Sequence, residues 1–306
     1  MRNAFAEQLY INAKKNKKIN IVAADISPAG SMEKLRNEYP DRFINVGVAE
    51  QVMIGVCAGL AMRGKKPFAY TIATFSLYRP FEMIRDDLCY QNLDVTIVGM
   101  GAGTIYSNLG GTHLTQEDIS IAKSLPNMKI ICPCDPLELK EAVNYCSSKS
   151  KGPTYLRIGK SGEKNYSQFS NEKWKFGKIR KIVNGSKMCI LTYGPIIKKA
   201  FDLREKLKVL KINPSIYSCH TIKPLDKSRI KKIFKKYKTI LIVEDHSIIN
   251  GLGSDVKILA YENKYEGKIL EFSLKDQFFH SYENQDDMLD LHGISVNKIL
   301  NQIKKI

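Results

Sequence analysis

The stretch 43-FINVGVAEQVMIGVCAGLAMRG-64 joins two kinds of apolar segment through one short turn. Its first part, residues 43–46, has the aromatic and β-branched character of a buried strand. Its second part, from Gln51 through Arg63, is rich in small and apolar residues and predicts a helix. The turn between them ends at Glu50. A strand that leads directly into a buried helix is typical of α/β proteins.

The position of Glu50 alone allows two interpretations. A glutamate in the first turn of a helix is favoured by the helix dipole, by about 0.3–1 kcal/mol. A carboxylate held where a buried strand meets a buried helix could instead take part in chemistry. The rest of the chain has to decide between a helix cap and a catalytic group.

Strands and helices alternate along the whole first half of the chain. Apolar runs predict strands at residues 19–25, 43–49, 67–72, 94–100, 129–134 and 153–158. Helices are expected at residues 3–18, 50–63, 77–92 and 116–124, and from residue 135 onward. This alternation favours a parallel sheet with helices on both faces.

A polar stretch around Trp174 interrupts this pattern. We predict a linker at residues 163–178, between a first domain at residues 1–162 and a second domain at residues 179–306. The second domain repeats the alternation, with strands expected at residues 187–194, 213–219, 239–245 and 268–273, and helices at residues 195–209, 226–237, after 250–256 and at 295–304. The predicted fold class is therefore α/β, with two domains that each contain a mostly parallel sheet covered by helices on both faces.

Composition narrows the class of protein. No apolar run is long enough to span a bilayer, and the N-terminus lacks the apolar core of a signal peptide, so we expect a cytoplasmic protein without a membrane partner. The formal net charge is +17, but the lysines are spread over both halves without interleaved aromatic residues, so no nucleic-acid partner is expected. The seven scattered cysteines lack disulfide or zinc-site spacing and are expected to be reduced thiols in the core.

Many short motifs, in order along the chain, resemble those of the transketolase family of thiamine diphosphate enzymes. The matching stretches are Asp25, 47-GVAEQ-51, Phe75, Tyr78, Arg85, 110-GGTHLT-115, 152-GPTYLRIGK-160, 190-ILTYG-194, 222-IKPLD-226, 243-VEDH-246 and 251-GLGS-254. They cover nearly the whole chain, and together they are far more specific than any single motif. The resemblance implies a pyrimidine-binding domain followed by a transketolase C-terminal domain.

The resemblance also implies roles for individual residues. Glu50 corresponds to the catalytic carboxylate that hydrogen-bonds ring atom N1′ of the cofactor's aminopyrimidine and stabilises the imino tautomer that deprotonates the thiazolium C2. Phe75 corresponds to the aromatic residue that stacks on the aminopyrimidine, Tyr78 would flank the same ring, and Asp25 lies on the cofactor side. His113 corresponds to a catalytic histidine that faces the substrate and can donate a hydrogen bond or transfer a proton.

Purely structural interpretations stay open for the same residues. Phe75 and Tyr78 could pack in the core, and Asp25 could cap the turn at Ser27-Pro28. His113 could be a structural histidine of a glycine-rich loop, and His246 is expected to be structural or interfacial.

Half of a transketolase site is missing from this sequence. The family binds the cofactor's diphosphate through Mg²⁺ or Ca²⁺ with a Gly-Asp-Gly motif and a later Asn, and the chain contains no Gly-Asp-Gly. The glycine-rich 99-GMGAG-103 opens no convincing helix and is weak evidence for a phosphate cradle. The resemblance therefore implies the C-terminal subunit of a split transketolase. An N-terminal partner subunit would carry the metal, which this chain does not ligate, in an α₂β₂ assembly.

Several predicted substrate-binding positions depart from the family pattern. Leu109 stands where an aspartate is usual, Gly101 where a histidine is usual, and Lys160 where an arginine is usual. Ala29 replaces a serine after Ser27-Pro28. A site that hydrogen-bonds its substrate discriminates strongly through those bonds. We therefore hypothesise that the chain serves a two-carbon ketol transfer to an aldehyde or ketone acceptor with a non-standard sugar substrate, such as a modified or nucleotide-linked sugar.

Three alternatives remain at this point. Deoxyxylulose-phosphate synthases and the β subunits of 2-oxo acid dehydrogenases (E1β) share the same cofactor fold, and decarboxylation of pyruvate would separate both from ketol transfer. The third alternative is a non-catalytic scaffold subunit with a basic binding surface. Retention of Glu50, Phe75 and His113 argues against the scaffold.

Overall fold

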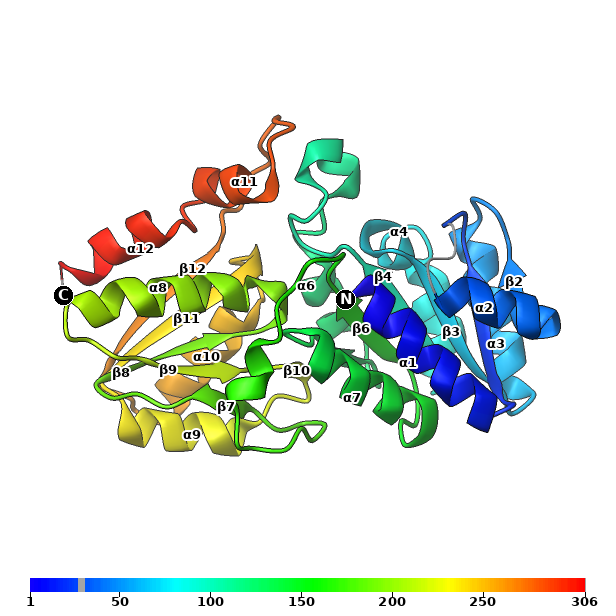
Figure 1. The fold of residues 1–306 in the computed structure, drawn as a ribbon, viewed down its shortest axis with the longest axis horizontal. Coiled ribbons are helices and arrows are strands. Elements are labelled where there is room, and N and C mark those ends of the chain that lie inside the picture. Colours follow the sequence, from blue (N-terminus) through cyan, green and yellow to red (C-terminus); the bar gives the residue numbers. More distant parts are fainter. Residues whose placement is uncertain (27–30, 306) are drawn as a thin grey trace.

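The computed structural model describes residues 1–26 and 31–305. The predicted turn at Ser27-Pro28 and the position of Ala29 lie outside the described residues. Two sheets, each flanked by helices, follow one another along the long axis of the molecule (Figure 1). This arrangement confirms the predicted α/β fold class.

The first sheet has seven strands and receives its last strand from the second half of the chain. Their spatial order is β10 (Thr221–Lys223), β5 (Lys129–Ile131), β6 (Thr154–Ile158), β4 (Thr96–Met100), β3 (Lys66–Ile72), β1 (Ile19–Ala23) and β2 (Phe43–Asn45). All neighbours are parallel except β10, which pairs antiparallel with β5. Because β10 extends the first sheet, the two halves of the chain share backbone hydrogen bonds.

Helices cover both faces of this sheet because its buried side chains alternate between the faces. Phe68 and Tyr70 of β3 pack against Phe5 of the first helix, with the Phe5 and Tyr70 rings stacked at 5.5 Å. Ala69 faces the opposite core, where Met53 of α3 (Glu50–Met62) is buried. The helical segments of this half are α1 (Arg2–Lys15), α2 (Ser31–Glu38), η1 (Pro40–Arg42), α3 (Glu50–Met62), α4 (Ala73–Leu77), α5 (Phe81–Met83), a π-helix η2 (Ile84–Tyr90), η3 (Ser107–Leu109), η4 (Gly111–His113), α6 (Asp118–Ser124) and α7 (Pro136–Ser148).

The second sheet has five strands and one antiparallel edge. Its spatial order is β12 (Lys268–Leu274), β11 (Thr239–Ser247), β8 (Met188–Thr192), β9 (Ser215–Ser218) and β7 (Arg180–Val183), and only the β7–β9 pairing is antiparallel. The helical segments of this half are η5 (Tyr166–Phe169), η6 (Gly194–Ile196), α8 (Ile197–Val209), α9 (Lys227–Lys236), α10 (Leu252–Glu262), α11 (Gln285–Leu291) and α12 (Val296–Ile303).

Every predicted strand is present, although several are shorter than predicted, and one predicted helix is interrupted. The helix expected at residues 77–92 begins only at Phe81, where α5 continues directly into η2, since Pro80 lacks the amide that would join it to α4 as one continuous helix. The strand expected at residues 43–49 ends at Asn45, whose side chain accepts a hydrogen bond from the amide of Gly47 at 3.0 Å. Sequence patterns did not reveal the short or polar elements α2, β7, β10 and α11.

A buried cluster around Arg157 connects the two sheets. Arg157 of β6 donates through Nε to Asp118 of α6 at 2.7 Å, and through Nη2 to the backbone carbonyl of Asp245 in β11 at 2.8 Å. The hydroxyl of Tyr155 donates to the same Asp118 oxygen at 2.8 Å. Buried charges are stable only when they are paired in this way. The cluster therefore sets how β6 and β11 meet.

No helix in the described ranges combines the length and apolarity needed to cross a membrane.

Replacing Asp118 with alanine should destabilise the protein by about 3–5 kcal/mol, because the buried Arg157 charge would lose its partner. Chemical denaturation measures the change. The matched control is Asp290→Ala, which removes an exposed pair with Lys298 at 2.8 Å and should cost at most about 1 kcal/mol. Equal losses in the two variants would contradict the linking role of the Asp118–Arg157 pair.

Candidate active site

Glu50 opens helix α3 and is almost completely buried, with 2% of its surface exposed. The preceding N-cap residue, Ala49, makes no side-chain cap hydrogen bond. Both carboxylate oxygens of Glu50 accept hydrogen bonds from Nη1 of Arg79, each at 3.1 Å. The carboxylate therefore has a side chain from another segment as its partner, which a helix-capping role alone does not explain.

Phe75 and His113 continue this group of side chains. The guanidinium carbon of Arg79 lies 4.2 Å from the centroid of the Phe75 ring. The His113 ring meets Phe75 edge-on, with centroids 5.2 Å apart. Three of the predicted site residues, Glu50, Phe75 and His113, thus come together through contacts with one another or with Arg79.

The environment of His113 favours its neutral form. Burial, and after it the nearby charge of Arg79, lowers the pKa of His113 below its ordinary value. Its Nδ1 lies 2.9 Å from the hydroxyl of Thr112, which orients the ring. A neutral imidazole can both donate and accept a hydrogen bond, as a group that handles a substrate proton must.

Tyr78 and Asp25 make their contacts elsewhere. The hydroxyl of Tyr78 donates to Glu117 Oε2 at 2.9 Å, and burial raises the pKa of this tyrosine above its ordinary value. Asp25 follows β1 in a left-handed conformation, with φ at +50°, and its amide donates to the side chain of Asn45 at 3.3 Å. The described contacts therefore do not join either residue to Glu50.

Tyr106 connects two of the predicted substrate-binding positions, and sequence reasoning missed it. Gly101 has φ at +69°, and a Cβ there would lie 2.0 Å from the Tyr106 ring, which fills the space beside it. The ammonium of Lys160 lies 4.8 Å from the centroid of the same ring, and His113 lies 6.3 Å from it. Leu109 is partly exposed in the same loop. The sequence did offer one signal: Tyr106 follows five positions after Gly101, the glycine that replaces the histidine usual in the family.

The backbone amides of the glycine-rich loop at residues 101–104 all donate hydrogen bonds within the protein. The amides of Gly101 and Ala102 donate to the carbonyl of Ile158 at 3.0 and 3.2 Å. The Gly103 amide donates to the hydroxyl of Thr115 at 2.6 Å, and the Thr104 amide to Asp245 at 3.1 Å. None of these four amides is left for a phosphate, so the loop is not a phosphate cradle.

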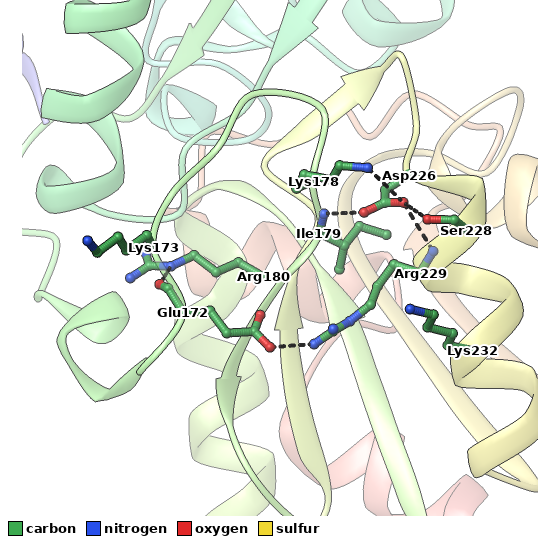
Figure 2. A pocket seen from close by; sticks show the side chains of 9 residues that line it. All are labelled: Glu172, Lys173, Lys178, Ile179, Arg180, Asp226, Ser228, Arg229 and Lys232. Carbon is green, nitrogen blue, oxygen red and sulfur yellow. Dashed lines mark hydrogen bonds and ion pairs between the residues drawn. The ribbon is translucent and has the colours of Figure 1, made fainter.

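A separate pocket of about 250 Å³ lies between the segment that leads into edge strand β7 and the start of α9 (Figure 2). Both of its carboxylates already have partners, because Glu172 accepts from Arg229 at 2.7 Å and Asp226 caps α9 by accepting from the Arg229 amide at 3.1 Å. None of the predicted site residues lines it. We therefore locate the candidate active site at Glu50, Phe75 and His113.

Comparison with known proteins decides the family. Residues 1–163 match the model of the transketolase pyrimidine-binding domain, and residues 177–299 match that of the transketolase C-terminal domain. This chain belongs to the transketolase family. Members of the transketolase family are transferases and use thiamine diphosphate.

This transketolase-family chain matches relatives of about its own length and relatives of about twice its length. The "Putative transketolase C-terminal section" of Methanocaldococcus jannaschii is 34% identical, with 100% of this chain and 96% of the relative aligned. The 1-deoxy-D-xylulose-5-phosphate synthase of Clostridium tetani is 28% identical over 99% of this chain, which spans only 48% of that enzyme. A solved structure titled "Split gene transketolase, inactive beta4 tetramer" is 30% identical, with a TM-score of 0.88 over 99% of this chain and 97% of that chain.

The described residues fit the aminopyrimidine half of thiamine diphosphate. Glu50 supplies a buried carboxylate, and Phe75 supplies an aromatic ring close to it. The hydroxyl of Thr74, next to Phe75, is buried and has no hydrogen-bond partner among the described residues. Glu50 would hold the ring nitrogen and Phe75 the ring face. The part of the chain that the structure describes contains no cluster of three His, Cys, Asp or Glu side chains that could hold a metal ion.

Gly101→Ala should destabilise the protein by about 1–3 kcal/mol, because its positive φ and the Tyr106 ring both disfavour a side chain. Thermal or chemical unfolding measures the loss. Gly111→Ala is the control, since a Cβ there would meet nothing within 4 Å, and its effect should stay within about 0.5 kcal/mol. A Gly101→Ala protein as stable as the control would show that Tyr106 does not occupy this space.

Proposed function

We propose that this chain is the C-terminal subunit of a split transketolase that transfers a two-carbon ketol unit from a ketose donor to an aldehyde or ketone sugar acceptor. The observation that carries the proposal is the grouping of Glu50, Phe75 and His113, three residues that the family resemblance had singled out separately. Two relatives that align with this chain over nearly their full length, one named a C-terminal section and one titled a split-gene transketolase, support the subunit assignment.

Each of the three residues has a separate task in this proposal. When bound, thiamine diphosphate supplies the carbon nucleophile that carries the ketol unit. Glu50 holds the nitrogen of the aminopyrimidine with a hydrogen bond, which is stronger in a buried environment than in water. Phe75 orients that ring by stacking. His113, neutral because its pKa is lowered, donates a hydrogen bond to a substrate oxygen or accepts a hydroxyl proton.

The substrate-facing surface supports a non-standard sugar. Tyr106 fills the space beside Gly101, and Leu109 places an apolar side chain where a carboxylate is usual. Lys160 offers a point charge in place of the planar fork of an arginine. We propose that these residues, with His113, select a sugar that is not an ordinary pentose-phosphate-pathway substrate.

The remaining half of the site belongs, in this proposal, to an N-terminal partner subunit. That subunit would carry the Gly-Asp-Gly motif and the Asn, bind Mg²⁺ or Ca²⁺ with the diphosphate, and form a cytoplasmic α₂β₂ tetramer with this chain. One face of α3 supports an interface there, because Val52 and Met62 are exposed and Gly55 and Gly59 have open space where a Cβ would lie.

Affinity purification of this chain from its native cells tests the assignment. Recovery of a stoichiometric partner that contains Gly-Asp-Gly and a later Asn is the expected result, with mass spectrometry as the readout. Recovery of the chain alone, or only as a homo-oligomer, would contradict the split-enzyme proposal and favour the scaffold alternative.

In the recovered complex, Glu50→Gln should lower ketol transfer by about 10²–10⁴-fold, since the amide cannot replace the carboxylate at the ring nitrogen. Thermal unfolding should change little, which separates a catalytic from a structural loss. Glu7→Gln on the exposed face of α1 is the control and should keep full activity. Full activity in Glu50→Gln would refute the role of this carboxylate.

Substrate choice is tested with the same complex. We expect xylulose 5-phosphate with ribose 5-phosphate to be turned over more slowly than a modified-sugar pair, and pyruvate not to be decarboxylated. Faster turnover of the standard pair would refute the non-standard substrate, and decarboxylation of pyruvate would point to the synthase or dehydrogenase alternatives.

A further inference from the structure

Arg79 touches both groups that the proposed function assigns to the aminopyrimidine. Its Nη1 lies 3.1 Å from each carboxylate oxygen of Glu50, and its guanidinium carbon lies 4.2 Å from the centroid of Phe75. One planar group therefore spans the carboxylate and the aromatic ring. The family motifs used to identify the site do not include Arg79.

The guanidinium and the aminopyrimidine have similar binding chemistry. A guanidinium is planar, carries N–H donors in its plane and stacks on aromatic faces. A protonated aminopyrimidine is also a planar nitrogen donor that stacks on an aromatic ring. Both groups satisfy Glu50 through an N–H and Phe75 through their flat face, so the same two side chains suit either of them.

We propose that Arg79 occupies the aminopyrimidine position whenever the cofactor is absent and that its side chain must move away before the cofactor can bind. The inference rests on the proposed function, since it requires that Glu50 and Phe75 receive the aminopyrimidine. Two planar groups cannot fill the same space between one carboxylate and one ring face. The Arg79 side chain is 44% exposed, so it can swing toward solvent without unfolding its surroundings.

In the absence of cofactor, the contact with Arg79 stabilises the buried Glu50 carboxylate, but it also lowers the affinity for the cofactor. A buried carboxylate without a partner is unfavourable, and Arg79 supplies that partner until another cationic group arrives. Only molecules in which Arg79 has moved away can bind the cofactor, so the apparent affinity is the intrinsic affinity multiplied by the fraction of such molecules. Arg79 thus competes with the aminopyrimidine for the same two side chains, Glu50 and Phe75.

A different role for Arg79 predicts the opposite result. If Arg79 stayed in contact with Glu50 in the loaded enzyme, it would be a positioning residue, and removing it would weaken cofactor binding. The sign of the change in affinity therefore separates the two roles.

The test is a calorimetric titration of thiamine diphosphate, with Mg²⁺ present, into the complex of this chain with its co-purified partner. Arg79→Gln should bind the cofactor about fivefold to tenfold more tightly than the wild type, because the ion pair of the partly exposed Arg79 with Glu50 and its cation–π contact with Phe75 no longer compete. Arg79→Lys, which keeps the charge but lacks the planar group, should fall between them. Arg36→Gln is the matched control, because Arg36 is 43% exposed and pairs with Glu33 at 3.3 Å, and its affinity should equal that of the wild type.

Partner affinity, measured without cofactor, should be the same for all four proteins within about twofold. Equal or weaker cofactor binding by both Arg79 variants, in a complex whose wild type binds the cofactor, would overturn the inference and leave the proposed function intact. Absence of saturable cofactor binding in the wild-type complex would overturn the proposed function, and the inference with it. If Arg79→Gln fails to fold, the Arg79→Lys titration decides by the same sign.

Discussion

The buried ion pair between Asp118 and Arg157 is the interaction on which the rest of the structure depends. It joins α6 to β6, and the second donor nitrogen of Arg157 reaches the carbonyl of Asp245 in the other sheet. A charge this deeply buried tolerates few geometries, because each lost hydrogen bond leaves an uncompensated charge. The side chain of Asp245 then holds Thr104 in the glycine-rich loop. The relative position of the two sheets and the path of the loop thus depend on the same few residues.

The glycine-rich loop at residues 101–104 offers no free backbone amides to a ligand. Its amides serve Ile158, Thr115 and Asp245, so no nest of free N–H groups is present there for a phosphate. The chain instead offers a carboxylate, an aromatic face and a histidine. That set suits a flat heterocycle and a sugar, and in the proposed enzyme a partner subunit would hold the diphosphate.

Much of the fold could be predicted because buried parallel strands are short continuous apolar runs separated by helices. The elements that were missed lack this signal. Strand β10 has only three residues, and α11 begins with three polar ones, so neither shows a periodic pattern. The helix predicted across Pro80 was wrong because local propensity was extended past a residue that cannot donate to a helix. The hydroxyl of Tyr78 bonds to Glu117 and not to the Glu50 group, and its role beside the cofactor stays a prediction.

By itself, the sequence determined the class of fold, the order of its motifs and the identity of Glu50, Phe75 and His113 as candidates, because these depend on residue type and local order. Only the tertiary structure showed that Arg79 pairs with Glu50, that Tyr106 fills the space beside Gly101 and that Asp245 holds Thr104. These contacts join side chains from separate segments, up to 141 residues apart for Thr104 and Asp245. No local pattern encodes such a contact, because burial and chain topology decide which side chains meet.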